Sequence, residues 1–221
     1  MFPVRSRMPK SQPPNDLKPY FLVLDDIDQE YGGQLDWPKF FGNDRPVEID
    51  VGCGRGLFMF RASGEQPQRN FLGIEIDYKE GRRGARRLQK QQRTNARVLG
   101  GDVNVPFTRM IAHHSVDAIH VYFPDPWWKA RHRRRRVFND QFVDLCANLL
   151  KAGGELHSWT DVEEYFGVIS GLMNHHALFD ALPPPPERDA ADDMDYQTSF
   201  ERKKRKDGWT IHRGLWRRKP L

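Results

Sequence analysis

The sequence predicts an α/β protein in which a doubly wound, mostly parallel sheet carries helices on both faces. Apolar, β-branched segments alternate with helical segments from residue 47 to about residue 175, which is the pattern of successive strand–helix–strand units. A glycine-rich turn over residues 52–56 joins the first of these strands to the first helix. Because the carboxyl ends of parallel strands meet at one edge of a sheet, we expect the functional residues there.

The chain of 221 residues is long enough for one such domain. We expect a flexible basic arm over residues 1–16 and a single domain over residues 17–221. Within that domain, residues 183–197 combine four prolines with several acids and predict a mobile loop. The oligomeric state expected is a monomer or a weak homodimer.

Composition indicates the kind of partner. The net charge is +5 with a pI near 9.3, and the basic residues are clustered, which favours a polyanionic partner. The two cysteines, Cys53 and Cys146, offer neither a disulfide framework nor a metal quartet, so we expect packing roles for both and no metal. No apolar run approaches the roughly 20 residues of a membrane span, and no secretory signal opens the chain. These features predict a cytoplasmic protein without a membrane partner.

The glycine turn Gly52-Cys53-Gly54-Arg55-Gly56 follows a predicted strand over residues 47–51 and precedes a helix from Leu57. Glycine lets the backbone approach a ligand, and the helix amino terminus lies just beyond. Asp50 stands before the first glycine, where it would repel a pyrophosphate but attract the sulfonium and ammonium groups of S-adenosylmethionine (SAM). A glycine triplet alone is weak evidence, so the context decides.

The next two predicted strands also end in acids. The strand over residues 70–77 ends at Glu75 and Asp77, and a third strand near residues 96–99 leads to Asp102. An acid at the end of the second strand suits the two ribose hydroxyls of an adenosine cofactor. Asp77 fits a helix N-cap better than Glu75 does. Asp102 is either an acceptor for the adenine amine or only a turn residue.

The fourth predicted strand leads into Pro124-Asp125-Pro126-Trp127-Trp128. Each proline fixes its own φ and extends the residue before it, so Asp125 sits on a stiff segment. Trp127 and Trp128 are followed by a cationic run. A flat aromatic surface beside cations suits the binding of a nucleic-acid base and its phosphates. The alternative is that the basic run is a solvated face or a nuclear-import signal and that Asp125 only caps a helix. The basic residues concerned are Lys129, Arg131, Arg133, Arg134, Arg135 and Arg136.

The remaining segments complete the predicted sheet. A helix over residues 138–150 should stop at the Lys151–Gly154 segment. A fifth strand over residues 155–159 then leads to Asp161, a helix covers residues 162–175, and a final strand covers residues 209–216.

At this point the sequence resembles the bacterial tRNA (guanine-N7-)-methyltransferases, the family that modifies guanosine 46 of the variable loop. The resemblance covers roughly residues 35–217, in the right order. The glycine turn is common to SAM enzymes, whereas Phe-Pro-Asp-Pro-Trp with a basic tail and a late Thr-x-x-Glu are more specific. The matching segments are Asp50–Gly56, Gly73–Glu75, Gly101-Asp102, Phe123–Trp127 with Lys129, Arg131 and His132, Thr160-Asp161, and Thr198–Glu201.

The resemblance implies a Rossmann-like, seven-stranded SAM-methyltransferase sheet, SAM as cofactor and tRNA as partner. Asp125 would be the catalytic residue, and the arginines of residues 131–136 would hold RNA phosphates. At Asp50 the family usually has Glu, and at Trp128 it usually has Pro. The implied cofactor contacts are Asp50, Gly52, Gly54, Gly56, Glu75, Asp102 and Asp125, and the implied substrate contacts are Lys129, Asp161, Thr198, Ser199, Phe200 and Glu201.

The chemistry fits a carboxylate that positions rather than deprotonates. Guanine N7 carries an exposed lone pair, so it can attack a methyl group without losing a proton. Asp125-Pro126-Trp127-Trp128 also loosely resembles the Asp/Asn-Pro-Pro-aromatic motif of enzymes that methylate exocyclic amines, which leaves that reaction as an alternative. A third possibility is a non-catalytic RNA-binding protein, although acids at three successive strand ends do not help RNA binding.

Overall fold

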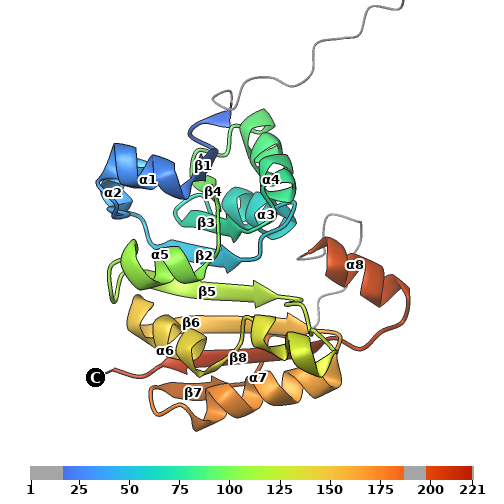
Figure 1. Ribbon diagram of the computed structural model, residues 1–221. Coiled ribbons are helices and arrows are strands. Elements are labelled where there is room, and N and C mark those ends of the chain that lie inside the picture. Colours follow the sequence, from blue (N-terminus) through green and yellow to red (C-terminus); the bar gives the residue numbers. More distant parts are fainter. Residues whose placement is uncertain (1–16, 187–197, 221) are drawn as a thin grey trace, which may run out of the picture.

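The computed structural model describes residues 17–186 and 198–220, which form one eight-stranded sheet in the order β1-β4-β3-β2-β5-β6-β8-β7. Strands β1 to β6 pair in parallel, and β8 pairs antiparallel with both β6 and β7 (Figure 1). The strands are β1 (Phe21–Val23), β2 (Val47–Val51), β3 (Asn70–Glu75), β4 (Ala96–Gly100), β5 (Val116–Tyr122), β6 (Leu150–Thr160), β7 (Phe179–Leu182) and β8 (His212–Arg218).

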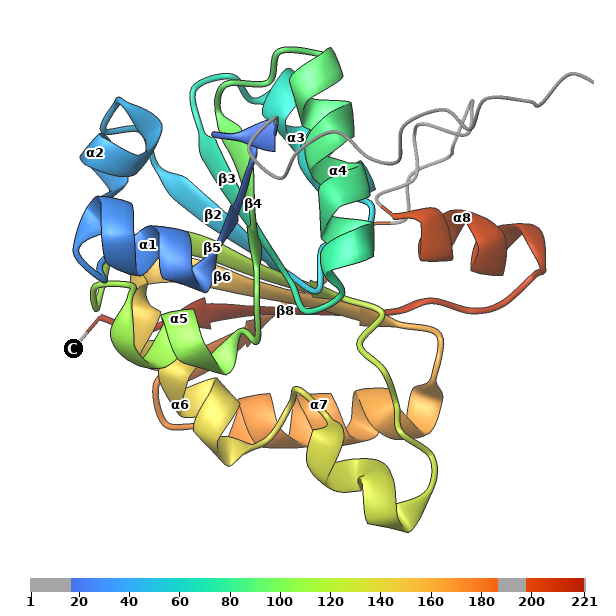
Figure 2. The same ribbon diagram turned by 45° about the horizontal axis from the view of Figure 1, so that its top comes forward.

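Helices cover both faces of this sheet, as predicted (Figure 2). One face packs against α1, α2, α5, α6 and α7, and the other against α3 and α4. In β3, Phe71 belongs to one apolar cluster and Leu72 to the other, because successive side chains of a strand point to opposite faces. The helices are α1 (Leu24–Tyr31), α2 (Trp37–Phe41), α3 (Leu57–Glu65), α4 (Tyr78–Lys90), α5 (Asn104–Arg109), the 3-10 helix η2 (Ala130–Arg135), α6 (Asp140–Leu149), α7 (Glu163–His175) and α8 (Ser199–Lys206).

Three details of the predicted fold were wrong. The count of seven strands was too low, because the described residues form eight and β1, at three residues, is too short for an alternating pattern to reveal it. Helix α6 ends at Leu149, and the Lys151–Gly154 segment lies inside β6 instead of forming a separate stop. The last strand is shifted to His212–Arg218, where its pairing with β6 fixes the register.

Both cysteines are buried, which confirms their predicted packing roles. His175 and His176 lie at the carboxyl end of α7, where Nε2 of His176 lies 3.1 Å from Oδ1 of Asp144. The predicted basic arm lies outside the described residues, as does most of the predicted loop over residues 183–197.

Candidate active site

The carboxyl ends of the parallel strands form the candidate site. Strand β2 lies between β3 and β5, so the chain order reverses beside β2, and ligands of open α/β sheets bind at the carboxyl ends of the strands at such a point. Figure 1 shows β5 and β6 pointing toward the side of the molecule that carries α8. The glycine turn and the loop that contains Asp125 therefore meet at this edge.

The glycine turn is held in shape by Glu75. The amide of Gly54 donates a hydrogen bond of 2.7 Å to Oε2 of Glu75, and the amide of Asp77 donates one of 2.8 Å to Oε1. A Cβ atom added at Gly54 would meet no atom within 4 Å, so open space borders the turn there. At Gly56 a Cβ atom would lie 3.3 Å from Cα of Gly84, because α4 packs directly against the turn. The turn thus has one packed side and one open side.

Asp50 is a buried carboxyl near the carboxyl end of β2. It is 5% exposed, and burial together with the nearby charge of Glu75 raises its pKa to about 8. A bound cation would lower this pKa again, since an opposite charge favours the ionised carboxylate. The pair Asp50 and Glu75, next to an open glycine turn, therefore fits the ammonium and sulfonium groups of SAM.

Asp102 stabilises the turn after β4, which is one of the two roles that the sequence predicted for it. Its Oδ1 accepts hydrogen bonds of 2.9 Å from both the backbone and the side-chain nitrogen of Asn104. The residue is exposed just past the end of β4, so its carboxylate remains accessible to a ligand. Asp77 is the N-cap of α4, as predicted, and accepts from the amide of Lys79.

Sequence reasoning missed Ile76. This side chain is 70% exposed although it directly follows Glu75 at the end of β3. An exposed apolar residue beside a polar edge offers a surface for a flat ring. The signal in the sequence was an apolar residue between two acids just past a strand end.

The segment around Asp125 is strained at both ends. Phe123 has φ of +52° and Trp127 has φ of +42°, in the left-handed region that non-glycine residues rarely adopt. The amide of Phe123 donates a hydrogen bond of 2.7 Å to the carbonyl of Trp159 in β6. Nε of Arg136 donates one of 2.7 Å to the carbonyl of Pro126. Asp125 itself is exposed between these two attachments.

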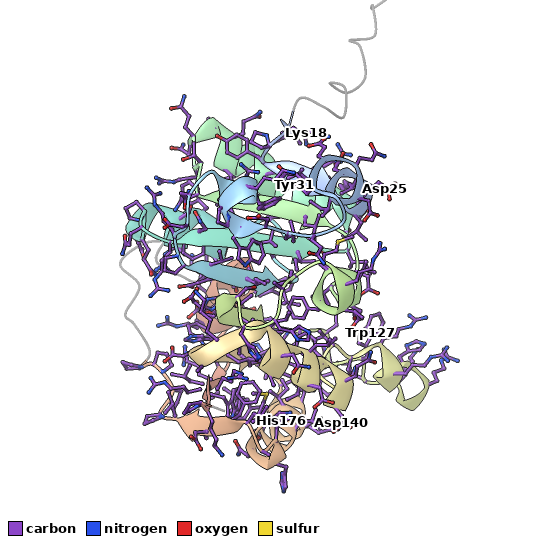
Figure 3. All side chains as sticks on the ribbon, turned by 90° about the vertical axis from the view of Figure 1, so that its left-hand side faces the viewer. Lys18, Asp25, Tyr31, Trp127, Asp140 and His176 are labelled. Carbon is purple, nitrogen blue, oxygen red and sulfur yellow. The ribbon has the colours of Figure 1, made fainter. Side chains whose placement is uncertain are left out.

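The basic segment projects from the sheet next to this loop. Lys129, Arg131, Arg134 and Arg135 are exposed. Figure 3 shows Trp127 beside the projecting segment, and the guanidinium of Arg135 lies 5.1 Å from its ring. Arg136 differs from its neighbours because it is only 9% exposed and bonded to Pro126. Its predicted phosphate contact stays a prediction, because its side chain lies in a different environment from those of its exposed neighbours. The side chain of Arg133 is not among those that the structure describes.

The predicted substrate residues converge on the same edge through α8. Asp161, just past β6, pairs with Lys204 of α8 at 2.7 Å. Phe200 is exposed and stacks on Phe123 with ring centroids 6.3 Å apart. Thr198 caps α8 by accepting a hydrogen bond of 3.0 Å from the amide of Glu201. The late Thr-x-x-Glu motif is thus a helix start that lies against the Asp125 loop. The side chain of Ser199 is not described.

A buried polar chain, also missed from sequence, lies behind this edge. Nε2 of His120 is 2.7 Å from Oε2 of Glu48, and Nδ1 of His120 is 3.0 Å from the hydroxyl of Tyr122. Burial lowers the pKa of His120 below its ordinary value, which favours the neutral ring at neutral pH. Glu48 then accepts from Nε2–H, and the Tyr122 hydroxyl donates to Nδ1. The signal was a polar residue in the middle of each of two apolar strands.

No group of three or more acids, histidines or cysteines that could hold a metal ion occurs among residues 17–186 and 198–220. Over the same ranges, every helix is too short or too polar to cross a membrane.

The sheet order, the glycine turn and the acids at the strand ends define a Rossmann-like methyltransferase. Solved structures agree on the fold. The 16S rRNA methyltransferase KamB matches with a TM-score of 0.56 at 15% identity, over 82% of this chain and 94% of its own. The aminoglycoside resistance methyltransferase NpmB1 matches with a TM-score of 0.54 at 16% identity, over 79% and 87%.

Sequence relatives identify the family. Residues 44–213 match a family of putative methyltransferases. A tRNA (guanine-N(7)-)-methyltransferase of Rhodopirellula baltica is 38% identical over 97% of this chain and 80% of its own length. An enzyme of the same name from Syntrophotalea carbinolica is 32% identical over 78% and 73%. The chain belongs to the tRNA (guanine-N7-)-methyltransferase family, which confirms the resemblance found in the sequence.

Proposed function

We propose that this enzyme transfers the methyl group of SAM to N7 of a guanosine in tRNA, at position 46 of the variable loop, and works in the cytoplasm, where tRNA is. The observation that carries the proposal is the strained Phe123–Trp127 segment. It presents an exposed carboxylate just past β5, the strand that pairs with β2, and it is followed in the chain by exposed arginines. Family membership supplies the substrate class.

The cofactor contacts follow from charge and open space. SAM, when bound, supplies an electrophilic methyl group on a sulfonium. Asp50 would hold the positive groups of the cofactor, and the backbone of Gly52 and Gly54 would border it because open space lies on that side. Each carboxylate oxygen retains a second lone pair, so Glu75 could accept from a ribose hydroxyl while it holds Gly54. The adenine acceptor would be Asp102, next to the exposed Ile76.

Guanine recognition requires an acceptor for two donors. The Watson–Crick edge of guanine presents N1–H and N2–H₂, and a fixed carboxylate can accept from both. We assign this task to Asp125, or to Asp161 together with Glu201, with Lys129 and the α8 start bordering the base. A carboxylate there also offsets the positive charge that develops on the methylated ring. No general base is needed, so alignment of N7, methyl carbon and sulfur accounts for much of the rate.

The exposed cations would position the RNA without reading its sequence. Arg131, Arg134 and Arg135 present guanidiniums to solvent along one segment, and such groups contact phosphate oxygens. Trp127, held in place beside Arg135, could stack on a base. The alternative reaction, methylation of an exocyclic amine, is distinguished by the following experiment.

The test is to identify the modified base. Unmodified tRNA would be incubated with the enzyme and methyl-labelled SAM, then treated with borohydride and aniline, which cleave the chain only at N7-methylguanosine. Cleavage at position 46 is the expected result. Label incorporated without any aniline cleavage would indicate methylation of an amine instead. RNA binding without label would indicate a non-catalytic protein.

A further inference from the structure

We infer that Arg136 is a positioning residue: it clamps the Asp125 segment to the protein body and does not contact RNA phosphate. The inference rests on the proposed function, because it concerns the loop that carries the proposed catalytic carboxylate. It also gives one arginine a different role from its neighbours, although the sequence does not distinguish them.

Arg136 is buried while its neighbours are exposed. It is 9% exposed, whereas Arg131, Arg134 and Arg135 all belong to the exposed class. A phosphate contact needs a guanidinium that polyanionic RNA can reach. The side chain of Arg136 instead turns inward at the end of η2, so the basic run divides into an exposed part and an anchor.

The anchor has two contacts that explain its position. Nε donates a hydrogen bond of 2.7 Å to the carbonyl of Pro126, one residue after Asp125. The guanidinium also lies 4.6 Å from the ring of Tyr165, which is fully buried in α7. Arg136 therefore links the loop to the core through α7. A charged donor makes the stronger kind of hydrogen bond.

The backbone around Asp125 needs such an anchor. Phe123 and Trp127 both have positive φ, and strained residues persist only where their surroundings hold them. The Phe123 end is fixed by the hydrogen bond to Trp159 and by the stack on Phe200. The Pro126 end is fixed by Arg136. Loss of this second attachment would let Trp127 relax to negative φ and move the carboxylate of Asp125.

The experiment compares Arg136→Gln with Arg134→Gln, which removes the same charge from the exposed part of the same segment. Hydrogen exchange of the peptide that spans residues 123–129, measured without substrate, should rise at least fivefold in Arg136→Gln and stay near wild type in Arg134→Gln. Single-turnover methylation at saturating tRNA and SAM should fall at least tenfold in Arg136→Gln. The salt dependence of its tRNA binding should stay unchanged, whereas Arg134→Gln should lower that slope by about 0.9.

Chemical rescue tests the same contact. Guanidinium at tens of millimolar should restore part of the activity of Arg136→Ala, because it can occupy the space over Tyr165 and donate to Pro126. A reduced salt slope in Arg136→Gln, with normal exchange and a normal single-turnover rate, would overturn the inference and make Arg136 a phosphate contact. If the wild-type enzyme failed to methylate tRNA, the proposed function would be wrong, but the exchange measurement would still test the clamp.

Discussion

Glu75 and Gly54 are joined by a hydrogen bond of 2.7 Å that ties the end of β3 to the glycine turn after β2. The same carboxylate accepts from the amide of Asp77. Glu75 thus shapes the glycine turn, in addition to the cofactor contact that we propose for it. A substitution at Glu75 should therefore disturb the glycine turn as well as the proposed ribose contact.

Glu75→Gln should weaken SAM binding by roughly 1–3 kcal/mol, the scale of a charge-assisted hydrogen bond. The variant keeps the shape of the side chain but directs an amide N–H₂ group at a backbone donor. Isothermal titration calorimetry measures the effect. Asp77→Asn, which alters the adjacent helix cap, is the control. Unchanged SAM affinity in Glu75→Gln would remove the residue from the site.

The free enzyme should lose stability as pH rises from about 6.5 to 8. Asp50 has a folded pKa of about 8 against an ordinary value of 3.8, so over this range the folded state binds more protons than the unfolded state. The free energy of unfolding must then fall as pH rises, and the loss is complete above the folded pKa. Asp50→Asn should flatten this slope in thermal unfolding scans and also weaken SAM binding. Parallel slopes in the two proteins would contradict the assignment.

A second buried group should contribute to stability on the acid side. Burial lowers the pKa of His120, so the unfolded chain binds a proton more readily below about pH 6.5. The contribution of His120 to the free energy of unfolding should therefore fall as pH is lowered from 6.5 to 5, whereas that of Asp50 rises over the same range. His120→Gln should reduce that dependence, although the variant is less stable overall because Glu48 and Tyr122 lose their shared partner. Urea unfolding at several pH values provides the comparison.

Asp125 should be essential to turnover without acting as a base. Asp125→Asn presents a donor to the donors of guanine, so the single-turnover rate should fall about 100-fold or more. The wild-type rate, measured with SAM and tRNA both saturating, should stay flat between about pH 6 and 9. Saturation matters because the pKa of Asp50 is raised to about 8 and we propose that Asp50 binds SAM. A tenfold rise per pH unit would mean that a proton leaves before methyl transfer.

The exposed arginines should act through phosphates. Arg134→Gln combined with Arg135→Gln should weaken tRNA binding and lower its log–log salt slope by about 0.9 for each lost contact. SAM affinity should not change. The matched control is Lys39→Gln with Arg109→Gln, two exposed cations on α2 and α5, far from α8 in Figure 1. Equal effects in the two double variants would show only a general charge effect.

The sequence by itself determined the fold class and the family, and it predicted the edge of the sheet where the candidate site lies. Period-two and helical patterns are local, so they revealed β2 to β6 with the helices between them. Parallel strands bring their carboxyl ends to one edge, which is why the sequence alone groups Gly52, Glu75, Asp102, Asp125 and Asp161. Glycines and prolines added fixed backbone requirements at Gly54 and around Asp125.

Only the tertiary structure decided which residues of the same type have different environments and contacts. Arg134 and Arg136 are indistinguishable in a basic run, but one is exposed and the other reaches the Pro126 carbonyl and Tyr165. Glu48 and His120 are 72 residues apart in the chain and meet only because β2 pairs with β5. Burial, pKa and partner choice depend on such long-range contacts, and a local sequence pattern carries no information about them.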